Sequence, residues 1–386
     1  MRAGTFLGID HPIKWLETEL SLGSSQKLQL VNNHQEFSIR SRLCFSPLLL
    51  GVLLFLVGCR SPIGSSNRRG HWQRFEFTQP QMGLPFRLVF YAPDTDVAAQ
   101  AAAEAFKRVS ELNNILSDYE PESELNRLSR SSGQNLEVKV SPELWKVLAM
   151  AQQRAKESDG AFDVSVGPLV TLWRKARRDH RLPEPGSIRE AIGRVGYENI
   201  VLNPRTQTVR LLTPHMRLDL GGIAKGFALD EALRVLREHG CSRALVTGGG
   251  DMALGEPPPG KRGWKIEIPP LDSQTNEPSR LIELKNCGFA TSGDAVQKLE
   301  FNGVRYSHIV DPKTGLGLTD HNLVYVIARD SMTADSYSTT LSVLGPLKSK
   351  TLWGHPKAPI KARMLRELNT AVEVFHLGKF PLLSDE

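Results

Sequence analysis

Two adjacent glycines, Gly221 and Gly222, join a short apolar segment to an amphipathic one, and this junction does more than any other to limit the possible folds. Residues 218–220 predict the end of a strand, and residues 224–238 carry apolar side chains at helical spacing until Gly240 stops the helix. Glycines here let the backbone approach a phosphate closely, and a helix N-terminus favours such an anion. The junction predicts a fold with both strands and helices, and either a phosphate site or a plain tight turn.

The remaining periodic segments mix strands and helices without strict alternation. Strand patterns occur at residues 86–91, 244–247, 264–268, 323–328 and 371–375. Further helices are expected to begin near Asp96, Ser141, Ser187 and Met332. The third of these rests on a capping box of Ser187 with Glu190, and the last is expected to cover residues 332–344. This mixture predicts an α+β or mixed α/β fold, in which mixed sheets are packed by helices.

A basic and then apolar segment marks the N-terminal part of the chain. Arg40 and Arg42 precede an apolar run, residues 43–57, which is too short for a comfortable bilayer span and ends in a glycine and Cys59. Small residues before a Cys at this place resemble a bacterial lipobox, in which the Cys is lipid-modified; a buried strand or a plain membrane anchor is the alternative. About forty residues precede the run, more than an export signal normally carries, so we expect translation to start downstream of the first Met.

The sequence therefore predicts three parts. Residues 1–58 form an N-terminal extension with a lipoprotein signal peptide, residues 59–71 a flexible tether rich in Ser and Gly, and residues 72–386 the folded domain. Lipid on Cys59 would anchor the chain to a membrane of the bacterial cell envelope, with the domain facing the periplasm.

The net charge and the cysteines place few limits on the function of the chain. The net charge is +6, and five of the basic residues fall at Arg174, Lys175, Arg177, Arg178 and Arg181. This run lacks interleaved aromatic residues and any nucleic-acid fold signature, so we interpret it as a solvated loop or helix face and expect no nucleic-acid partner. Cys241 and Cys287 would form one disulfide in an oxidising compartment or remain buried free thiols.

A carboxylate and a hydroxyl stand four residues apart at Asp335 and Thr339. On a helix they share one face, and together they suit a hard cation such as Mg²⁺, which usually keeps waters and substrate phosphates as its other ligands. Taken alone, the pair fits an ordinary helix cap or helix surface better.

Three further motifs leave two readings open. His308 precedes a turn at residues 311–315 and would contact a ligand or serve a structural role. Asp163 lies in a glycine-bounded apolar segment, where it would bond a ligand or its own loop. Three glycines at residues 248–250 permit close approach of a ligand or simply a sharp turn.

Taken together and in this order, the segments resemble the ApbE family of FAD:protein FMN transferases, over about residues 81–345. The matching motifs are residues 116–119, 123–126, 161–163, 166–173, 219–226, 248–251, 291–294, 307–315 and 334–339.

The resemblance implies an ApbE-like flavin transferase fold and the transfer of FMN from FAD to a threonine or serine of another protein, with release of AMP. It implies FAD contacts at Met82, Tyr119, Ala161, Phe162, Asp163, Asp219, Lys225 and His308. It also implies Mg²⁺ ligation by Asp335, Thr339 and the Gly222 carbonyl. The partner would be an acceptor flavoprotein subunit of a membrane redox complex.

Two alternatives use the same site. Water in place of the acceptor hydroxyl would make the chain an FAD pyrophosphatase that yields free FMN and AMP, and no turnover at all would make it a non-catalytic FAD-binding lipoprotein. For transfer, a carboxylate must take the hydroxyl proton, and we expect Asp294 to be that catalytic residue.

Overall fold

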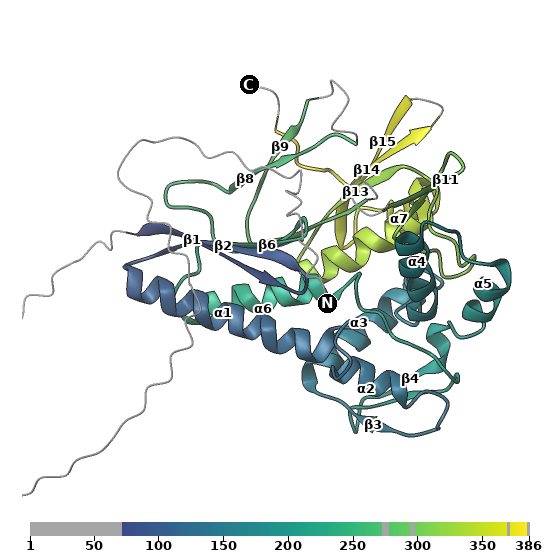
Figure 1. The fold of residues 1–386 in the computed structure, drawn as a ribbon. Helices are drawn as coiled ribbons and strands as arrows, with labels where there is room; N and C mark the ends of the chain where they lie inside the picture. The colour runs from purple at the N-terminus through teal and green to yellow at the C-terminus, as the bar shows by residue number, and fades with distance from the viewer. Residues whose placement is uncertain (1–71, 272–277, 294–297, 369–370, 384–386) are drawn as a thin grey trace, which may run out of the picture.

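An eight-stranded sheet, antiparallel at every neighbouring pair, forms the centre of the computed structural model, which describes residues 72–271, 278–293, 298–368 and 371–383 (Figure 1). Its strands, in spatial order, are β1 (Gln73–Gln81), β2 (Leu84–Ala92), β6 (Ala244–Gly248), β7 (Asp251–Leu254), β10 (Cys287–Gly293), β13 (Asn322–Ala328), β14 (Ile360–Leu368) and β15 (Ala371–Leu377). Seven α-helices are described, so the expected mixture of helices and sheets is confirmed.

The two faces of the sheet are covered by different elements. Helices α1 (Thr95–Leu116), α6 (Ala224–Glu238) and α7 (Ser331–Trp353) cover one face, and the hairpin of β8 (Trp264–Ile268) and β9 (Arg280–Leu284) covers the other (Figure 1). Alternation along β2 serves both layers, because Leu88 and Phe90 pack with the helices while Val89 packs with the hairpin.

Smaller elements extend the helical side. Helices α2 (Glu124–Arg130) and α3 (Pro142–Glu157) lie next to a three-stranded sheet of β3 (Val138–Lys139), β5 (Thr208–Leu211) and β4 (Ile200–Asn203), which the 3-10 turn η1 (Tyr197–Asn199) precedes (Figure 1). Helices α4 (Gly167–Asp179) and α5 (Pro185–Ile192) pack with the hairpin of β11 (Lys298–Phe301) and β12 (Val304–Ser307) around the buried Trp173. Among the described helices, none is long and apolar enough to cross a bilayer.

Most sequence-based boundaries agree with these elements, and the exceptions have local causes. Asp94 caps α1 by accepting from the Val97 N–H at 2.9 Å, so Asp96 is a first-turn residue and not the cap. Helix α5 begins at Pro185, whose fixed φ suits a first turn, so the capping box of Ser187 with Glu190 is wrong.

One further expectation needs correction. Residues 218–220 form no strand, and the chain there is held by single contacts: an isolated bridge of Arg217 with Val166 and a 2.8 Å bond from the Asp219 N–H to the Val164 carbonyl. The predicted end of the last helix near Leu344 agrees with the structure, because α7 is interrupted at Gly345, where φ is 69°, and a second helical segment follows it.

Helices α6 and α7 cross in close contact at Gly226. A Cβ on Gly226 would lie 2.3 Å from the Ser331 carbonyl oxygen, so only glycine allows this approach. Gly226→Ala is expected to lower the free energy of unfolding by about 2–3 kcal/mol through overpacking, although alanine favours a helix elsewhere. Urea denaturation would measure the loss. Gly186→Ala in α5 is the matched control, because its Cβ would meet nothing closer than 4.0 Å; an equal loss in both variants would contradict the close crossing.

Asp230 of α6 caps the start of α7, and burial makes this contact pH-dependent. Its carboxylate accepts the Ser331 and Met332 N–H groups at 2.9 and 2.8 Å. Burial raises the pKa of Asp230 from 3.8 to about 7, and the two N–H donors oppose this only in part. The folded protein therefore holds a proton that the unfolded chain releases, and stability falls as pH rises from about 4 to about 7.

We expect this fall in the free energy of unfolding to be on the order of a few kcal/mol. It should be clearly smaller in Asp230→Asn, which cannot titrate. Urea denaturation at a series of pH values measures both proteins, and an identical pH profile in the variant would contradict the assignment.

Candidate active site at the glycine turn

The turn before α6 is built by short-range bonds. The Asp219 carboxylate accepts the Gly221 N–H at 2.8 Å, and the Lys225 ammonium reaches back to the Gly221 carbonyl at 3.0 Å. No side chain caps the start of α6 at Ile223. Instead, Asp335 of α7 accepts the Gly226 N–H at 3.0 Å, so a carboxylate from a distant part of the chain lies at the positive end of this helix.

The structure brings the three expected metal-site residues together. A Cβ on Gly222 would lie 2.8 Å from the Thr339 hydroxyl oxygen and 3.3 Å from the Phe162 ring. Asp335 lies one helical turn before Thr339 and is only 2% exposed. The glycine turn and α7 therefore face each other at contact distance, and this spacing requires glycine at 222.

Lys225 lies between two buried carboxylates. Its ammonium is 3.2 Å and 3.3 Å from the two oxygens of Asp335 and 3.3 Å from one oxygen of Asp251. The other Asp251 oxygen accepts the Thr291 N–H at 3.0 Å. Burial alone would lower the pKa of Lys225, but the two carboxylates outweigh it and raise that pKa. Burial raises the pKa of Asp251 to about 7, although Lys225 opposes this shift.

The charge and the oxygen atoms of this cluster suit a further cation. Two carboxylates face one ammonium, and the buried Thr291 Oγ1 has no hydrogen-bond partner. The described residues contain no group of three acidic, His or Cys side chains able to hold a metal. The donors present are one carboxylate, one hydroxyl and backbone carbonyls, all hard oxygen ligands that suit Mg²⁺ when waters and substrate supply the rest.

A second ionic network borders the turn. Arg174 donates to Asp219 at 2.9 Å, pairs with Asp118, and lies over the Tyr119 ring at 4.1 Å from its centroid. Burial, helped by the charge of Asp118, raises the pKa of Asp219 to about 6, and Arg174 opposes this. Tyr119 itself is 71% exposed, which leaves a free aromatic face beside Asp219.

This network corrects one interpretation of the basic run. Lys175, Arg178 and Arg181 are exposed as expected, but Arg174 belongs to the site and not to a solvated face. Helix α4 buries Leu169 and Trp173, and Arg174 directly follows the buried Trp173. That position beside the apolar stripe is the sequence signal that could have identified it.

The segment at residues 161–163 approaches the glycine turn with the Phe162 ring. Ala161 and Phe162 are buried, and the Phe162 N–H donates to the Ser158 hydroxyl at 3.1 Å. Asp163 bonds its own loop, since it accepts from the Ser165 N–H and hydroxyl and from the Tyr197 N–H at 2.8, 2.6 and 2.9 Å. Burial raises the pKa of Asp163. The carboxylate therefore fixes the loop that presents its two neighbours.

The remaining predicted site residues are tied less directly to the glycine turn. Met82 lies in the turn between β1 and β2 with φ at 51°. That hairpin reaches the site, because a Cβ on Gly249 would lie 2.7 Å from Leu84 and 3.8 Å from the Lys225 side chain. His308 is half-buried in the bend after β12. Asp294 and Cys59 lie outside the described residues, as does the tether.

Residues 248–251 gain a role that sequence reasoning left open. Gly249 and Gly250 connect β6 to β7 and place Asp251, which is 1% exposed, beside Lys225. Of the two alternatives for Cys241 and Cys287, the structure confirms free thiols and not a disulfide, with Cys241 buried and Cys287 half-buried.

Comparison with known proteins identifies this arrangement. The sequence model of the ApbE family matches residues 82–364. The chain is 36% identical over 248 residues to the FAD:protein FMN transferase of Haemophilus influenzae (62% of this chain, 71% of the relative), and 31% identical over 319 residues to that of Treponema pallidum (78% and 87%).

Solved structures agree with the sequence relatives. The ApbE protein of Thermotoga maritima matches with a TM-score of 0.71 at 28% identity, over 78% of this chain and 97% of that one. The flavin transferase ApbE of Vibrio cholerae matches with a TM-score of 0.72 at 26% identity, over 79% and 97%. From the glycine turn to α7, the sequence and the fold lead to one conclusion: the chain belongs to the ApbE family.

Proposed function

We propose that this protein transfers the FMN half of FAD to a threonine or serine hydroxyl of an acceptor protein and releases AMP. The names of its relatives in Haemophilus and Treponema, both FAD:protein FMN transferases, support the reaction. The observation that carries the proposal for this chain is the contact of the Gly222 turn with Thr339 beside Asp335 and Lys225.

FAD would bind along the row of residues that borders the turn. The positive end of the α6 dipole and the Lys225 ammonium would attract the diphosphate. Tyr119 and Phe162 offer aromatic surfaces beside it. Asp163 holds the loop that carries Phe162, and Asp219 holds the glycine turn. Met82, Ala161 and His308 complete the proposed set of FAD contacts.

Mg²⁺ fits the donor atoms of this site. Asp335, Thr339 and the Gly222 carbonyl would hold the ion, and Lys225 would shift its contact from Asp335 to Asp251, which already lies 3.3 Å from it. When bound, the ion would neutralise charge on the diphosphate and on the departing AMP.

The chemistry forms one phosphorus–oxygen bond and breaks another. The acceptor hydroxyl oxygen attacks the FMN-side phosphorus of the diphosphate, and the bond from this phosphorus to the bridging oxygen breaks, so AMP leaves with the bridging oxygen. The hydroxyl proton would pass to Asp294, which follows the end of β10, and then to solvent. The chain's own groups act by alignment and by charge, through the α6 N-terminus and Lys225.

A transfer assay tests the proposal. The purified chain would be incubated with FAD, Mg²⁺ and candidate acceptor domains, and flavin fluorescence would be measured on the denatured acceptor together with AMP in solution. Transfer predicts acceptor-bound flavin and AMP in equal amounts. Free FMN with AMP would mean an FAD pyrophosphatase, and bound FAD without AMP would mean a passive carrier; either result overturns the proposal.

We also propose a place for the reaction. The apolar run at residues 43–57 followed by Cys59 supports a lipid anchor in the bacterial cell envelope, with residues 59–71 as a tether and residues 72–386 as the transferase domain facing the periplasm. The acceptor would then be a flavoprotein subunit of a membrane redox complex. Loss of membrane association in Cys59→Ala would support the anchor, and unchanged association would exclude it.

A further inference from the structure

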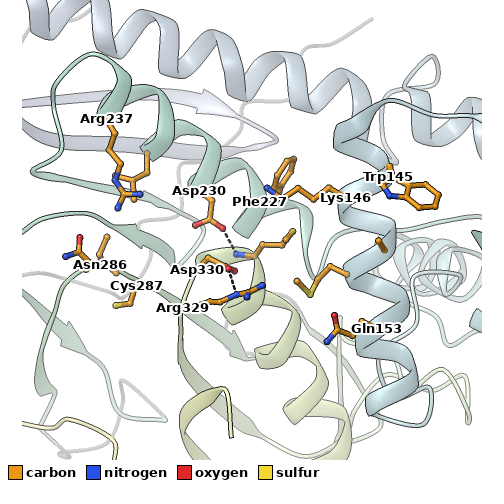
Figure 2. Close-up of a pocket in the computed structure, with 15 residues that line it drawn as sticks. Trp145, Lys146, Gln153, Phe227, Asp230, Arg237, Asn286, Cys287, Arg329 and Asp330 are labelled. Atoms are coloured by element: carbon orange, nitrogen blue, oxygen red, sulfur yellow. Dashed lines mark hydrogen bonds and ion pairs between the residues drawn. The ribbon is translucent and has the colours of Figure 1, made fainter. Parts of the chain in front are cut away.

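A cavity of about 750 Å³ lies apart from the glycine turn, between α3, α6 and the start of α7 (Figure 2). Its volume is typical of a pocket for a small ligand. It shares no lining residue with the cluster of Gly222, Lys225 and Asp335. Phe227, Asp230, Leu233 and Arg237 recur along one side of α6 at helical spacing, while Lys225 belongs to the site described above.

The walls of this cavity are aromatic and sulfur-containing. Trp145 and Met150 line it from α3, Phe227 from α6 and Met332 from α7. Flat aromatic side chains suit a flat ligand, and thioethers adapt to the edge of an aromatic ring. Such side chains on one helix alone would be ordinary packing, but here they line an open cavity from three helices.

Three cationic and two acidic side chains line the cavity. Lys146, Arg237 and Arg329 line it, and Figure 2 shows Lys146 extending toward Phe227 while Arg237 lies at the opposite end near Cys287. The Lys146 ammonium is 5.0 Å from the centre of the Phe227 ring.

The charges of these groups do not cancel. Arg329 pairs with Asp330 at 2.9 Å, and both carboxylate oxygens of Asp230 accept N–H groups at the start of α7. Within the described part of the chain, Lys146 and Arg237 have no carboxylate within salt-bridge distance. Two cations at opposite ends of an aromatic cavity are therefore left for an anion.

We propose that this cavity is a second ligand site, which binds a small aromatic anion: a flat ring system carrying a phosphate, carboxylate or sulfonate, such as a nucleoside monophosphate. The ring lies in the cavity beside Phe227, and its anionic group is held by Lys146 or Arg237. Because α6 and α7 line the cavity and also carry Lys225 and Asp335, an occupant contacts the same two helices as the glycine turn.

The probes are AMP and the aryl sulfonate 8-anilinonaphthalene-1-sulfonate, titrated against the full chain by calorimetry and by fluorescence. Lys146→Glu/Arg237→Glu reverses both exposed cations without touching the core. We expect this variant to weaken binding of both probes about tenfold or more. Lys265→Glu, an exposed charge reversal on β8, is the matched control and should bind as the unaltered chain does. Equal binding in the unaltered chain and the double variant would overturn the proposal.

Cys287 gives a readout of position. It lines the cavity and is half-buried, whereas Cys241 is fully buried. Burial raises the pKa of the Cys287 thiol to about 11, so labelling by methyl methanethiosulfonate would be followed at pH 9 by mass spectrometry of the Cys287 peptide. Either probe should slow this labelling several-fold.

The aromatic part of the proposal is tested by a third ligand. Decanoate carries the same charge as an aryl carboxylate but no ring. Displacement of the sulfonate by AMP, with weaker displacement by decanoate, supports an aromatic ligand; displacement by decanoate alone, or no protection of Cys287, contradicts it.

Discussion

Asp335→Ala will lower the release of AMP from FAD by about 10²- to 10³-fold or more, because it removes the only side-chain carboxylate of the proposed ion site. The same change leaves the Gly226 N–H without its acceptor and removes one of the two carboxylate partners of Lys225. We therefore expect a loss of unfolding free energy of about 1–3 kcal/mol, which leaves the protein folded. AMP would be quantified by chromatography, and folding by thermal unfolding.

Asp320→Ala is the matched control for this variant. Asp320 is a half-exposed carboxylate that pairs with Arg366 on the surface at 2.8 Å, and its loss should leave AMP release unchanged. Full activity in Asp335→Ala, with half-saturation by Mg²⁺ also unchanged, would remove α7 from the site.

Lys225→Ala will destabilise the protein by about 3–5 kcal/mol, because the buried carboxylates of Asp251 and Asp335 then lose the cation that they share. Both carboxylates are at most 2% exposed. If the cluster accepts Mg²⁺, the ion should now replace the ammonium, so added Mg²⁺ should raise the unfolding temperature of the variant more than that of the unaltered chain. FMN transfer should still fall, because the diphosphate loses a positive partner.

Thermal unfolding with and without Mg²⁺ measures this exchange of cations. Lys265→Ala, which removes an exposed ammonium from β8, should show the Mg²⁺ response of the unaltered chain. A Mg²⁺ shift in Lys225→Ala no larger than in the unaltered chain would show that Asp251 and Asp335 do not receive the ion.

Local sequence signals predicted the parts of the site that depend on local structure. The glycine turn, the helix at residues 224–238 and the shared face of Asp335 and Thr339 follow from turn chemistry and helical spacing, and the structure has each of them. What spacing could not supply is the contact between Gly222 and Thr339, which are far apart in the chain and meet only through the crossing of α6 and α7.

The missed elements were those whose pattern is set by tertiary packing. Strand β1 carries polar residues and Pro80. The sheet tolerates this proline because β1 is an edge strand. Arg174 reads as part of a basic run, and only the fold brings Asp118 and Asp219 to it. Asp251 reads as the end of a glycine turn, and its pairing with Lys225 requires β7 and α6 to pack together.

Crystals soaked with FAD and Mn²⁺, an anomalous scatterer with ligand preferences close to those of Mg²⁺, would test the central claim most directly. The prediction is one anomalous peak in contact with Asp335, Thr339 and the diphosphate of FAD, beside the carbonyl of Gly222. FAD bound elsewhere, or FAD bound at the turn with the Mn²⁺ peak away from Asp335 and Thr339, would contradict it.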